Sequence, residues 1–328
     1  MAVDRVALAS AASSGERVDA SLDTTFGHAP AVYVATRRRM SMNGWTTLLV
    51  FLPPALLLFT IFVALPMVEA GWYSFFNWNG FGRPEKFVGL KNYAYVASNP
   101  AFTRALINNG LIIVASLLVQ LPLALGVALL IAGRMTGAVW FRMIFFLPYI
   151  LADVAAGLIW RFMFDGQIGL PAIVTSLFGL QPFYLLASTD WAFTAVLIVI
   201  LWKYFGFHMM LYIAGLQSLD KSLLEAAEMD GASAVQRFWH ITLPLLRPYL
   251  LVAFLLRLIF EFRSFDNVYV MTSGGPANAT MVLSMYTYLA SFVRFDLSLG
   301  AASSWMMLLI SLIMCGCFIA LVRRRDAN

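Results

Sequence analysis

The stretch that decides the organisation of this chain reads Glu225-Ala226-Ala227-Glu228-Met229-Asp230-Gly231, and Ile241-Thr242-Leu243-Pro244 follows after nine further residues. The chain as a whole is 61% hydrophobic and only 12% charged, so a charged, helix-forming insert of this kind has to lie in water. Gly231 permits a close backbone turn, and we expect Pro244 to break the chain before the next helix. The pattern predicts two short helices at an angle, held rigidly between two membrane-spanning helices.

Long apolar segments lie on both sides of this insert. A spanning helix needs about 20 mostly apolar residues. Backbone groups in lipid must be satisfied locally, and no alternating short strands are present, so each segment is predicted to be a helix. The predicted fold class is all-α, a polytopic membrane protein whose six transmembrane helices have approximate bounds 46–68, 106–132, 140–164, 191–216, 246–271 and 299–322.

The distribution of Lys and Arg predicts the orientation of these helices, because cytoplasmic loops carry an excess of positive charge. Thirteen such residues fall on one side: Arg5, Arg17, Arg37, Arg38, Arg39, Arg134, Arg142, Lys221, Arg237, Arg247, Arg323, Arg324 and Arg325. Six fall on the other side: Arg83, Lys86, Lys91, Arg104, Arg161 and Arg294. Both termini and the loop that carries Glu225 are therefore expected to be cytoplasmic. The net charge of +5 follows from this asymmetry and indicates no nucleic-acid partner.

Three regions are predicted along the chain. Residues 1–44 are rich in Ala, Ser and Thr and are expected to form a flexible cytoplasmic tail without a removable signal peptide. Residues 45–104 hold the first transmembrane helix and an external, aromatic-rich segment. Residues 105–325 form a core of five helices, with the polar loop at 218–246.

The sequence lacks the common motifs of nucleotide-binding sites, serine hydrolases and metalloproteases. It contains no Gly-Lys pair of a phosphate-binding loop, no G-x-S-x-G elbow and no H-E-x-x-H helix. The three histidines, His28, His208 and His240, are far apart. The two cysteines, Cys315 and Cys317, point to different faces of one helix without an acidic partner. We expect no catalytic residues, no metal site and no enzymatic activity.

Charged residues within predicted spans are costly and mark sites of function or of tight pairing. Glu261 follows Arg257 by four positions, so the two share a helix face and can neutralise each other. This structural explanation and a role in binding substrate weigh equally on charge alone. Aromatic neighbours favour the substrate role, because sugars stack on aromatic faces. The lone acids Asp153 and Glu69 are expected to lie near a membrane boundary.

The polar loop also carries a family resemblance. The pattern EAA-x3-G-x9-I-x-LP resembles the cytoplasmic motif of permease subunits in binding-protein-dependent ABC importers. Phe145 to Tyr149, followed by Gly157 to Trp160, resembles the start of the permease core, and Leu201 to Leu219 resembles the helix that leads into the loop. Phe87 to Tyr93 and Ser273-Gly274-Gly275-Pro276 resemble segments of the carbohydrate-uptake group, which includes maltose and glycerol phosphate permeases. The resemblance is collinear over roughly residues 48–325.

This resemblance implies a set of partners and site residues. Two permease subunits would pair as a heterodimer in a bacterial inner membrane, each presenting its loop to one of two ATPase subunits. These subunits would bind ATP and Mg²⁺, so this chain needs no cofactor of its own. An external solute-binding protein would deliver the sugar. The ATPase-coupling residues would be Glu225, Ala226, Ala227, Asp230, Gly231, Ile241, Leu243 and Pro244. The substrate path would include Lys203, Tyr204, Phe207, Arg257, Phe260, Glu261 and Ser264.

Alternatives remain open at this point. The family resemblance implies small or amide side chains where this sequence has Arg257 and Glu261, so the identity of the sugar is not fixed. An ion-gradient-driven secondary transporter of small polar solutes could use Glu261 or Asp153 as a proton carrier. A membrane enzyme or a structural scaffold is the other rival, and the missing catalytic motifs argue against the enzyme.

Overall fold

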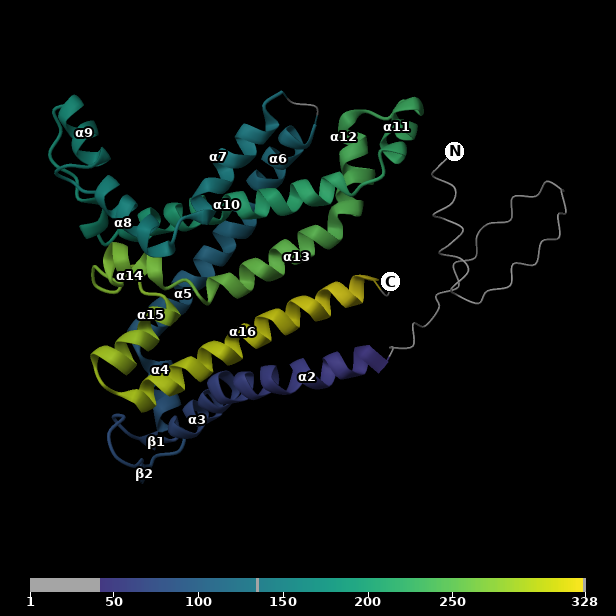
Figure 1. Cartoon of the computed structure of the whole chain (residues 1–328). Coiled ribbons are helices and arrows are strands. Elements are labelled where there is room, and N and C mark those ends of the chain that lie inside the picture. The colour runs from purple at the N-terminus through teal and green to yellow at the C-terminus, as the bar shows by residue number, and fades with distance from the viewer. Residues whose placement is uncertain (1–41, 134–135, 327–328) are drawn as a thin grey trace, which may run out of the picture. The chain divides into compact units, whose positions relative to one another are not determined.

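The computed structural model describes residues 42–133 and 136–326. The described residues are mainly helical (Figure 1), which confirms the predicted all-α class. The chain forms two compact units, residues 1–57 and 58–328. Of the first unit, the structure describes the greater part of helix α2 (Met42–Phe59). Most of the predicted N-terminal tail (1–44) lies outside the described residues, as do its five arginines and Arg134.

Five of the helices in the described part of the chain are long and apolar enough to cross a membrane. They cover Trp45–Tyr73, Pro100–Ala132, Ala192–Gln217, Ala234–Glu261 and Leu297–Arg323. A sixth span would be the bent pair α7 (Ala138–Ile150) and α8 (Asp153–Met163). The second span begins at Pro100, where the side chain of Asn99 caps it, and not at residue 106 as predicted.

Three of the spans contain a π-helical segment that ends directly before a Leu-Pro step. The segments are η1 (Thr60–Ala64), η2 (Ser116–Gln120) and η4 (Phe238–Thr242). In each, the leucine N–H donates to the carbonyl five residues earlier: Leu65 to Thr60, Leu121 to Ser116, and Leu243 to Phe238. Proline lacks a donor and its ring crowds the carbonyl four residues before it. The wider turn accommodates each proline, and the helix continues through α3 (Leu65–Tyr73), α6 (Leu121–Ala132) and α13 (Leu243–Glu261).

The single helix predicted at 140–164 is two helices in the structure, α7 and α8. The axes of α7 and α8 differ by 98° across residues 151 and 152, whose backbones are extended. Pro148 removes one amide donor near the end of α7. The ammonium of Lys203 donates to the carbonyls of Pro148 and Leu151, so it satisfies backbone groups that the break leaves open.

The predicted span at 246–271 also differs from the structure. Helix α13 ends at Glu261, and a separate short helix, α14 (Asp266–Thr272), follows after a turn. Arg263, predicted to lie within helix five, is in that turn and is exposed. Helix α14 packs against α8, so two short helices lie together at the end of the molecule opposite α11 and α12 (Figure 1).

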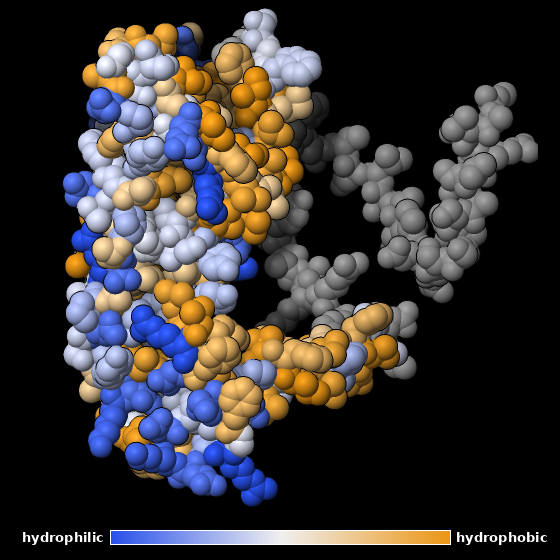
Figure 2. Space-filling model, turned by 90° about the vertical axis from the view of Figure 1, so that its left-hand side faces the viewer, coloured by the Kyte–Doolittle hydropathy of each residue, from blue (hydrophilic) through white to orange (hydrophobic). Residues whose placement is uncertain are grey.

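The segments between the spans form small elements at that same end. Strand β1 (Phe76–Asn77) pairs antiparallel with β2 (Lys86–Phe87), and α4 (Lys91–Ser98) follows. Other short elements are α9 (Leu170–Leu177), η3 (Leu185–Ala187), α15 (Leu283–Tyr288) and η5 (Leu289–Val293). Figure 2 views this end and shows hydrophilic residues, in blue, beside apolar patches in orange.

Two apolar clusters hold the second unit together. One joins α5 (Pro100–Ala115), α10 (Ala192–Gln217), α14, α15 and α16 (Leu297–Asp326). The other joins α6, α10 and α13 through residues such as Ala124, Met209 and Ala253. Helix α10 contributes to both clusters and packs on α6, α7 and α13, so it is the central helix of this unit. Outward residues such as Leu118 and Leu130 are more than 70% exposed and suit a lipid environment.

Candidate functional site: a polar loop and a charged membrane interior

The polar loop forms two short helices, as its sequence predicts. Helix α11 (Lys221–Met229) begins at Asp220, whose carboxylate accepts a hydrogen bond from the backbone N–H of Ser222 at 2.9 Å. That bond also lowers the pKa of the Asp220 carboxyl. Glu225 and Ala226 are exposed on α11, while Ala227 is half-buried. The Glu225 side chain makes no hydrogen bond or ion pair with any other described residue.

Gly231 ends α11 in a Schellman motif. Its φ of 81° is left-handed, a conformation that glycine adopts without a steric cost. The N–H of Ala232 donates to the carbonyl of Ala227, and the N–H of Gly231 donates to the carbonyl of Glu228. Asp230 is the C-cap residue and is exposed. Gly231 and Asp230 therefore set the angle between the two helices, a geometric role that their sequence positions indicate.

The second helix, α12 (Ala234–Arg237), is joined to the next span without a break. Ser233 and Gln236 form a capping box at its start, and Arg237 makes an ion pair with Glu228 of α11. Helix α12 continues through η4 into α13, so the predicted break at Pro244 is wrong because the π-helical turn accommodates the proline. Ile241 and Leu243 are half-buried along this continuous helix.

Contacts at the membrane end of the loop fasten it to the two spans. The hydroxyls of Ser218, at the end of α10, and Tyr249, in α13, are 2.9 Å apart. Gly215 lies so close to Tyr249 and Leu246 that a Cβ atom there would meet their side chains at under 3 Å. The loop at 218–246 is thus a stiff element whose motion would move α10 and α13 together.

The predicted pair Arg257 and Glu261 is present and fully buried. The guanidinium of Arg257 lies 3.0 Å from the Glu261 carboxylate, and its Nε donates to the Ser116 hydroxyl at 2.7 Å. Asn109 donates to the same carboxylate at 3.4 Å and accepts from the backbone N–H of Leu283 at 2.9 Å. The two charges therefore join α5, η2, α13 and α15, and their exposed fractions are 1% and 0%.

A second ion pair lies at the break between α7 and α8. The ammonium of Lys203 is 3.2 Å from the carboxylate of Asp153. The same carboxylate oxygen accepts bonds from the Tyr204 hydroxyl at 3.3 Å and from the Asn267 amide at 3.5 Å. Asp153 was predicted to be a lone acid, which is wrong. Spacing within one segment could not reveal the pair, because its members are fifty residues apart on different helices.

A cavity of about 510 Å³ opens beside this second pair. Three residues predicted for the substrate path line it, namely Lys203, Tyr204 and Phe260. Its other walls carry aromatic and charged residues that were not predicted for this site: Phe146, Tyr149, Asp153, Arg263 and Asp266. The cavity thus combines ring faces with hydrogen-bonding groups, which is the composition of a site for a polyhydroxylated ligand.

The remaining predicted path residues do not line the cavity. Phe207 is half-buried and stacks on Tyr149, with ring centres 5.0 Å apart. The hydroxyl of Ser264 is buried and has no hydrogen-bond partner among the described residues. Arg257 and Glu261 do not line the cavity, although the Arg257 guanidinium lies 5.5 Å from the centre of the Tyr204 ring.

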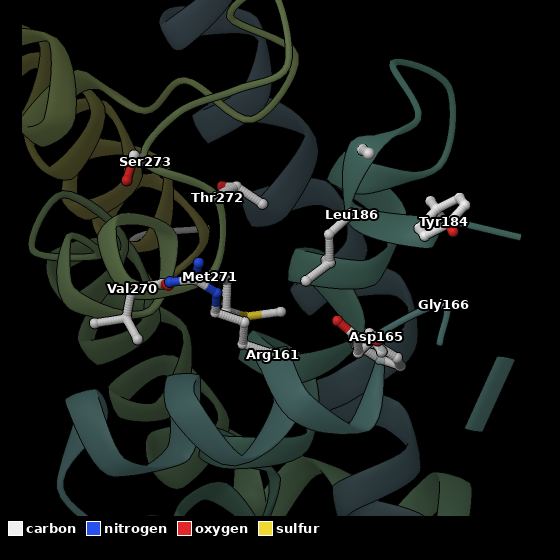
Figure 3. A pocket seen from close by; sticks show the side chains of 11 residues that line it. Arg161, Asp165, Gly166, Tyr184, Leu186, Val270, Met271, Thr272 and Ser273 are labelled. Atoms are coloured by element: carbon white, nitrogen blue, oxygen red, sulfur yellow. The ribbon is translucent and has the colours of Figure 1, made fainter. Parts of the chain in front are cut away.

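An outer cavity of about 330 Å³ lies between α8, the residues near η3 and the end of α14 (Figure 3). The guanidinium of Arg161 donates to the carbonyl of Val270 at 3.3 Å, which ties α8 to α14. The carboxylate of Asp165 accepts from the backbone N–H groups of Gln167 and Ile168. Helices α8 and α14 therefore contribute residues both to this cavity and to the one beside Lys203.

Within residues 42–133 and 136–326, no three His, Cys, Asp or Glu side chains are grouped so that they could hold a metal ion. Cys315 and Cys317 are free thiols in α16.

Comparisons with known proteins agree with the geometry. Residues 129–327 match the family described as Binding-protein-dependent transport system inner membrane component. The chain is 33% identical to the Sulfoquinovosyl glycerol transport system permease protein SmoG of Agrobacterium fabrum, over 84% of this chain and 90% of that protein. It is 35% identical to the Trehalose/maltose transport system permease protein MalF of Thermococcus litoralis, over 72% and 80% respectively.

A solved structure shares the fold. It is a bacterial alginate ABC transporter in complex with an alginate pentasaccharide-bound periplasmic protein, with a TM-score of 0.75 and 22% identity. The match covers 86% of this chain and 95% of the matched chain. At this identity the likeness concerns the fold alone. The relatives from Agrobacterium and Thermococcus are both transport permeases by name, so the comparisons do not favour an ion-driven transporter.

Proposed function

The chain belongs to the family of inner-membrane components of binding-protein-dependent transport systems, among permeases of sugar ABC importers, and from that premise we propose that it moves a carbohydrate inward at the cost of a partner's ATP. The observation that carries this proposal is the stiff loop at 218–246, which is built into α10 and α13. These are the two helices that carry Lys203, Tyr204 and Phe260 to the cavity. A force on the loop therefore reaches the cavity through continuous helices.

The loop is the proposed contact with a cytoplasmic ATPase subunit. Glu225 is its free carboxylate, and Ala226 beside it is small enough to seat in a groove. Exposed apolar side chains surround them, with Met229 89%, Val235 66% and Trp239 59% exposed. Interfaces combine such apolar contacts with a few charged anchors. Asp230 and Gly231 set the angle, while Ile241, Leu243 and Pro244 belong to the helix that transmits the motion.

The complex proposed around this chain contains a second permease subunit, in a heterodimer, and two ATPase subunits that bind ATP and Mg²⁺. An external solute-binding protein delivers the sugar. In support, the family is defined by dependence on a binding protein, and a transporter of the same fold was solved with its periplasmic protein bound. Both termini and the loop are proposed to be cytoplasmic, which follows the Lys and Arg distribution.

The cavity beside the Lys203–Asp153 pair is the proposed sugar site. Tyr204 and Phe260 stack with their ring centres 6.1 Å apart and offer ring faces to a sugar. Lys203, Asp153 and Arg263 offer polar atoms to hydroxyl groups. Phe207 packs against Tyr149 and Phe260 of this wall, and Ser264 follows three residues after Glu261 on the path. Arg257 and Glu261 join the helices on which the wall is built, so we propose that they serve the path as structural residues.

The test of coupling is Glu225→Lys. Glu225 is exposed and has no partner among the described residues, so the variant should insert and fold normally. Reversing a charge that anchors an interface costs several kcal/mol, so sugar uptake and substrate-stimulated ATPase activity should fall by more than about tenfold. Uptake into proteoliposomes and ATP hydrolysis are the two measurements.

The matched control is Asp190→Lys, which makes the same charge change at an exposed position outside the loop. It should leave both activities within about twofold of the parent, as surface substitutions do. Full uptake by the Glu225→Lys transporter would defeat the proposal that this loop couples ATP hydrolysis to transport.

A further inference from the structure

A basic cavity of about 500 Å³ lies at the end of the molecule opposite the polar loop. Strands β1 and β2, helix α4 and the junction between η5 and α16 build its walls, so segments that are two hundred residues apart in sequence meet there. Its lining residues include Asn77, Lys86, Lys91, Asn92, Tyr95, Arg294 and Asp296. No step of the proposed transport path uses this cavity.

The charges in the cavity are unbalanced. Lys86, Lys91 and Arg294 are exposed, and none of them makes an ion pair with another described residue. The single acid, Asp296, accepts a hydrogen bond from the backbone N–H of Leu299 at the start of α16, so it already caps a helix. Three cations thus share one hollow with a single carboxylate, so the lining keeps an excess of positive charge.

The walls are fixed before any partner arrives. The backbone N–H of Trp78 donates to the Ser298 hydroxyl at 3.0 Å, and the N–H of Ser298 donates to the Trp78 carbonyl at 3.1 Å. Ser298 is 1% exposed, so this pair of hydrogen bonds joins the β1 segment to α16 in a buried position. Asn92 donates to the carbonyls of Ser74 and Phe76 and fixes α4 to the same wall.

Exposed apolar side chains lie close in sequence to the lining residues. Phe81 is 74%, Phe87 66%, Leu90 68% and Phe295 60% exposed. Phe295 lies between Arg294 and Asp296 and has a φ of 53°, which is rare for a residue with a side chain. Aromatic residues and arginine around a preformed hollow are the composition of a protein interface. In Figure 2, hydrophilic residues gather near the bottom of the view, over the β1–β2 region, beside orange patches.

We propose that this basic cavity is the docking site for a carboxylate-bearing surface of the external solute-binding protein. The inference rests on the proposed function, because it takes the transporter to be an importer supplied by such a protein and this end to be external. Acidic side chains of the partner would enter the hollow and pair with Lys86, Lys91 and Arg294. The exposed apolar residues next to these cations in sequence, Phe87, Leu90 and Phe295, would help to exclude water from those pairs and strengthen them.

The experiment uses the whole transporter in lipid nanodiscs and, as probe, the purified solute-binding protein of the same transport system. The variant is Lys91→Gln with Arg294→Gln, and the control is Arg83→Gln with Arg104→Gln. Both remove two exposed positive charges from the same side of the protein, but only the first pair lines the cavity. Association rate constants are measured at low and high salt, together with basal ATPase activity.

Electrostatic steering raises association rates by about tenfold or more at low salt. The cavity variant should therefore bind at least about tenfold more slowly than the parent at low salt, with a flatter salt dependence and unchanged basal ATPase activity. The control should stay within about twofold of the parent. A cavity variant that binds like the parent overturns the docking site.

Two further outcomes would overturn the proposal for different reasons. If the parent transporter does not bind the solute-binding protein at all, the proposed function fails, and this failure is distinct from that of the docking site. Phosphatidylglycerol is the other anion that a basic cavity could hold. If the variant loses bound phosphatidylglycerol in native mass spectrometry while the binding-protein rates stay unchanged, the cavity is a lipid site and the proposal is wrong.

Discussion

The two ion pairs in the membrane interior have similar lengths and different surroundings. Arg257 and Glu261 are 3.0 Å apart with exposed fractions of 1% and 0%, whereas Lys203 and Asp153 are 3.2 Å apart with fractions of 3% and 35%. The first pair lies within one helix and is enclosed by Ser116 and Asn109. The second joins two helices, and both of its members line a cavity.

This difference teaches that a charged residue in a membrane span can have either of two roles. It can hold helices together, or it can offer polar atoms to water or to a ligand. A sealed pair satisfies its own hydrogen bonds and fixes the helices around it, because an unpaired charge there would be very costly. A pair beside a cavity keeps part of its polar surface for water or a ligand. Exposure, and not the presence of charge, separates the two roles.

The largest expected effect would break the sealed pair. Arg257→Met leaves the Glu261 carboxylate buried without its cation, and such a loss costs about 3–5 kcal/mol. We expect a large fall in the thermal unfolding temperature of the purified complex and poor assembly in the membrane. Unfolding is followed by intrinsic fluorescence in detergent.

The double variant Arg257→Met with Glu261→Gln is the control for that loss. It removes both charges while keeping similar volumes, so it should recover most of the lost stability. If Arg257→Met alone unfolds at the temperature of the parent, the pair does not hold the helices together.

At the pair of Lys203 and Asp153, which lies beside the cavity, we expect a smaller loss of stability and a larger loss of transport. Lys203→Met removes the donor to the carbonyls of Pro148 and Leu151 and the cation beside Asp153. Unsatisfied groups of this kind cost about 1–3 kcal/mol, and partial exposure of Asp153 reduces the cost. The complex should assemble, while sugar uptake in proteoliposomes falls by about tenfold or more if the cavity is the sugar site.

Met210→Leu is a matched control on the same helix, because it changes a half-buried apolar residue that does not line the cavity. Its uptake should equal that of the parent. Lys203→Met with normal uptake would remove the contrast between the two pairs, because both would then be structural.

The smallest effect is expected at a carboxylate that lies wholly in water, Asp220. Its pKa is lowered by the hydrogen bond from the backbone N–H of Ser222. A lowered pKa means that the bond stabilises α11 at a pH above the usual carboxyl value and that this stabilisation is lost as the pH falls through the lowered value. Asp220→Asn keeps an N-cap without the charge, so it should remove this acid dependence and leave transport near normal.

Hydrogen exchange of the α11 amides, corrected for intrinsic rates, measures this effect at neutral and acid pH. The parent should exchange faster in acid, and Asp220→Asn should show little change. If the α11 amides of Asp220→Asn still exchange faster in acid, the acid dependence belongs to another titratable group.

Local signals in the sequence predicted much of the fold and of the loop. Hydropathy predicts six apolar spans, and five of them correspond to helices long enough to cross a membrane, because each of these is a continuous apolar run. Gly231 marks the turn of the polar loop because few other residues adopt a left-handed φ at low cost. The pair Arg257 and Glu261 follows from a spacing of four within a helix. Each of these features depends on residues that are close in sequence.

The remaining features depend on contacts between distant segments. The break between α7 and α8 lies in an apolar stretch, and its stabilising donor, Lys203, is on another helix. The same separation hid the pairing of Asp153 and the cavity that it lines. Pro244 was misinterpreted because proline commonly ends a helix, and no sequence signal distinguishes a break from a π-helical turn.

The Leu-Pro steps have a geometric consequence for the spans that contain them. A π-helical segment inserts one residue without adding a turn, and each residue of a helix advances by about 100° around the axis. The halves of each span are therefore out of phase, and the segment Phe238–Thr242 decides which way Arg257 points relative to the cytoplasmic end of the same helix. Deleting one residue there would rotate the arginine away from Ser116, although a hydropathy profile would hardly register the change.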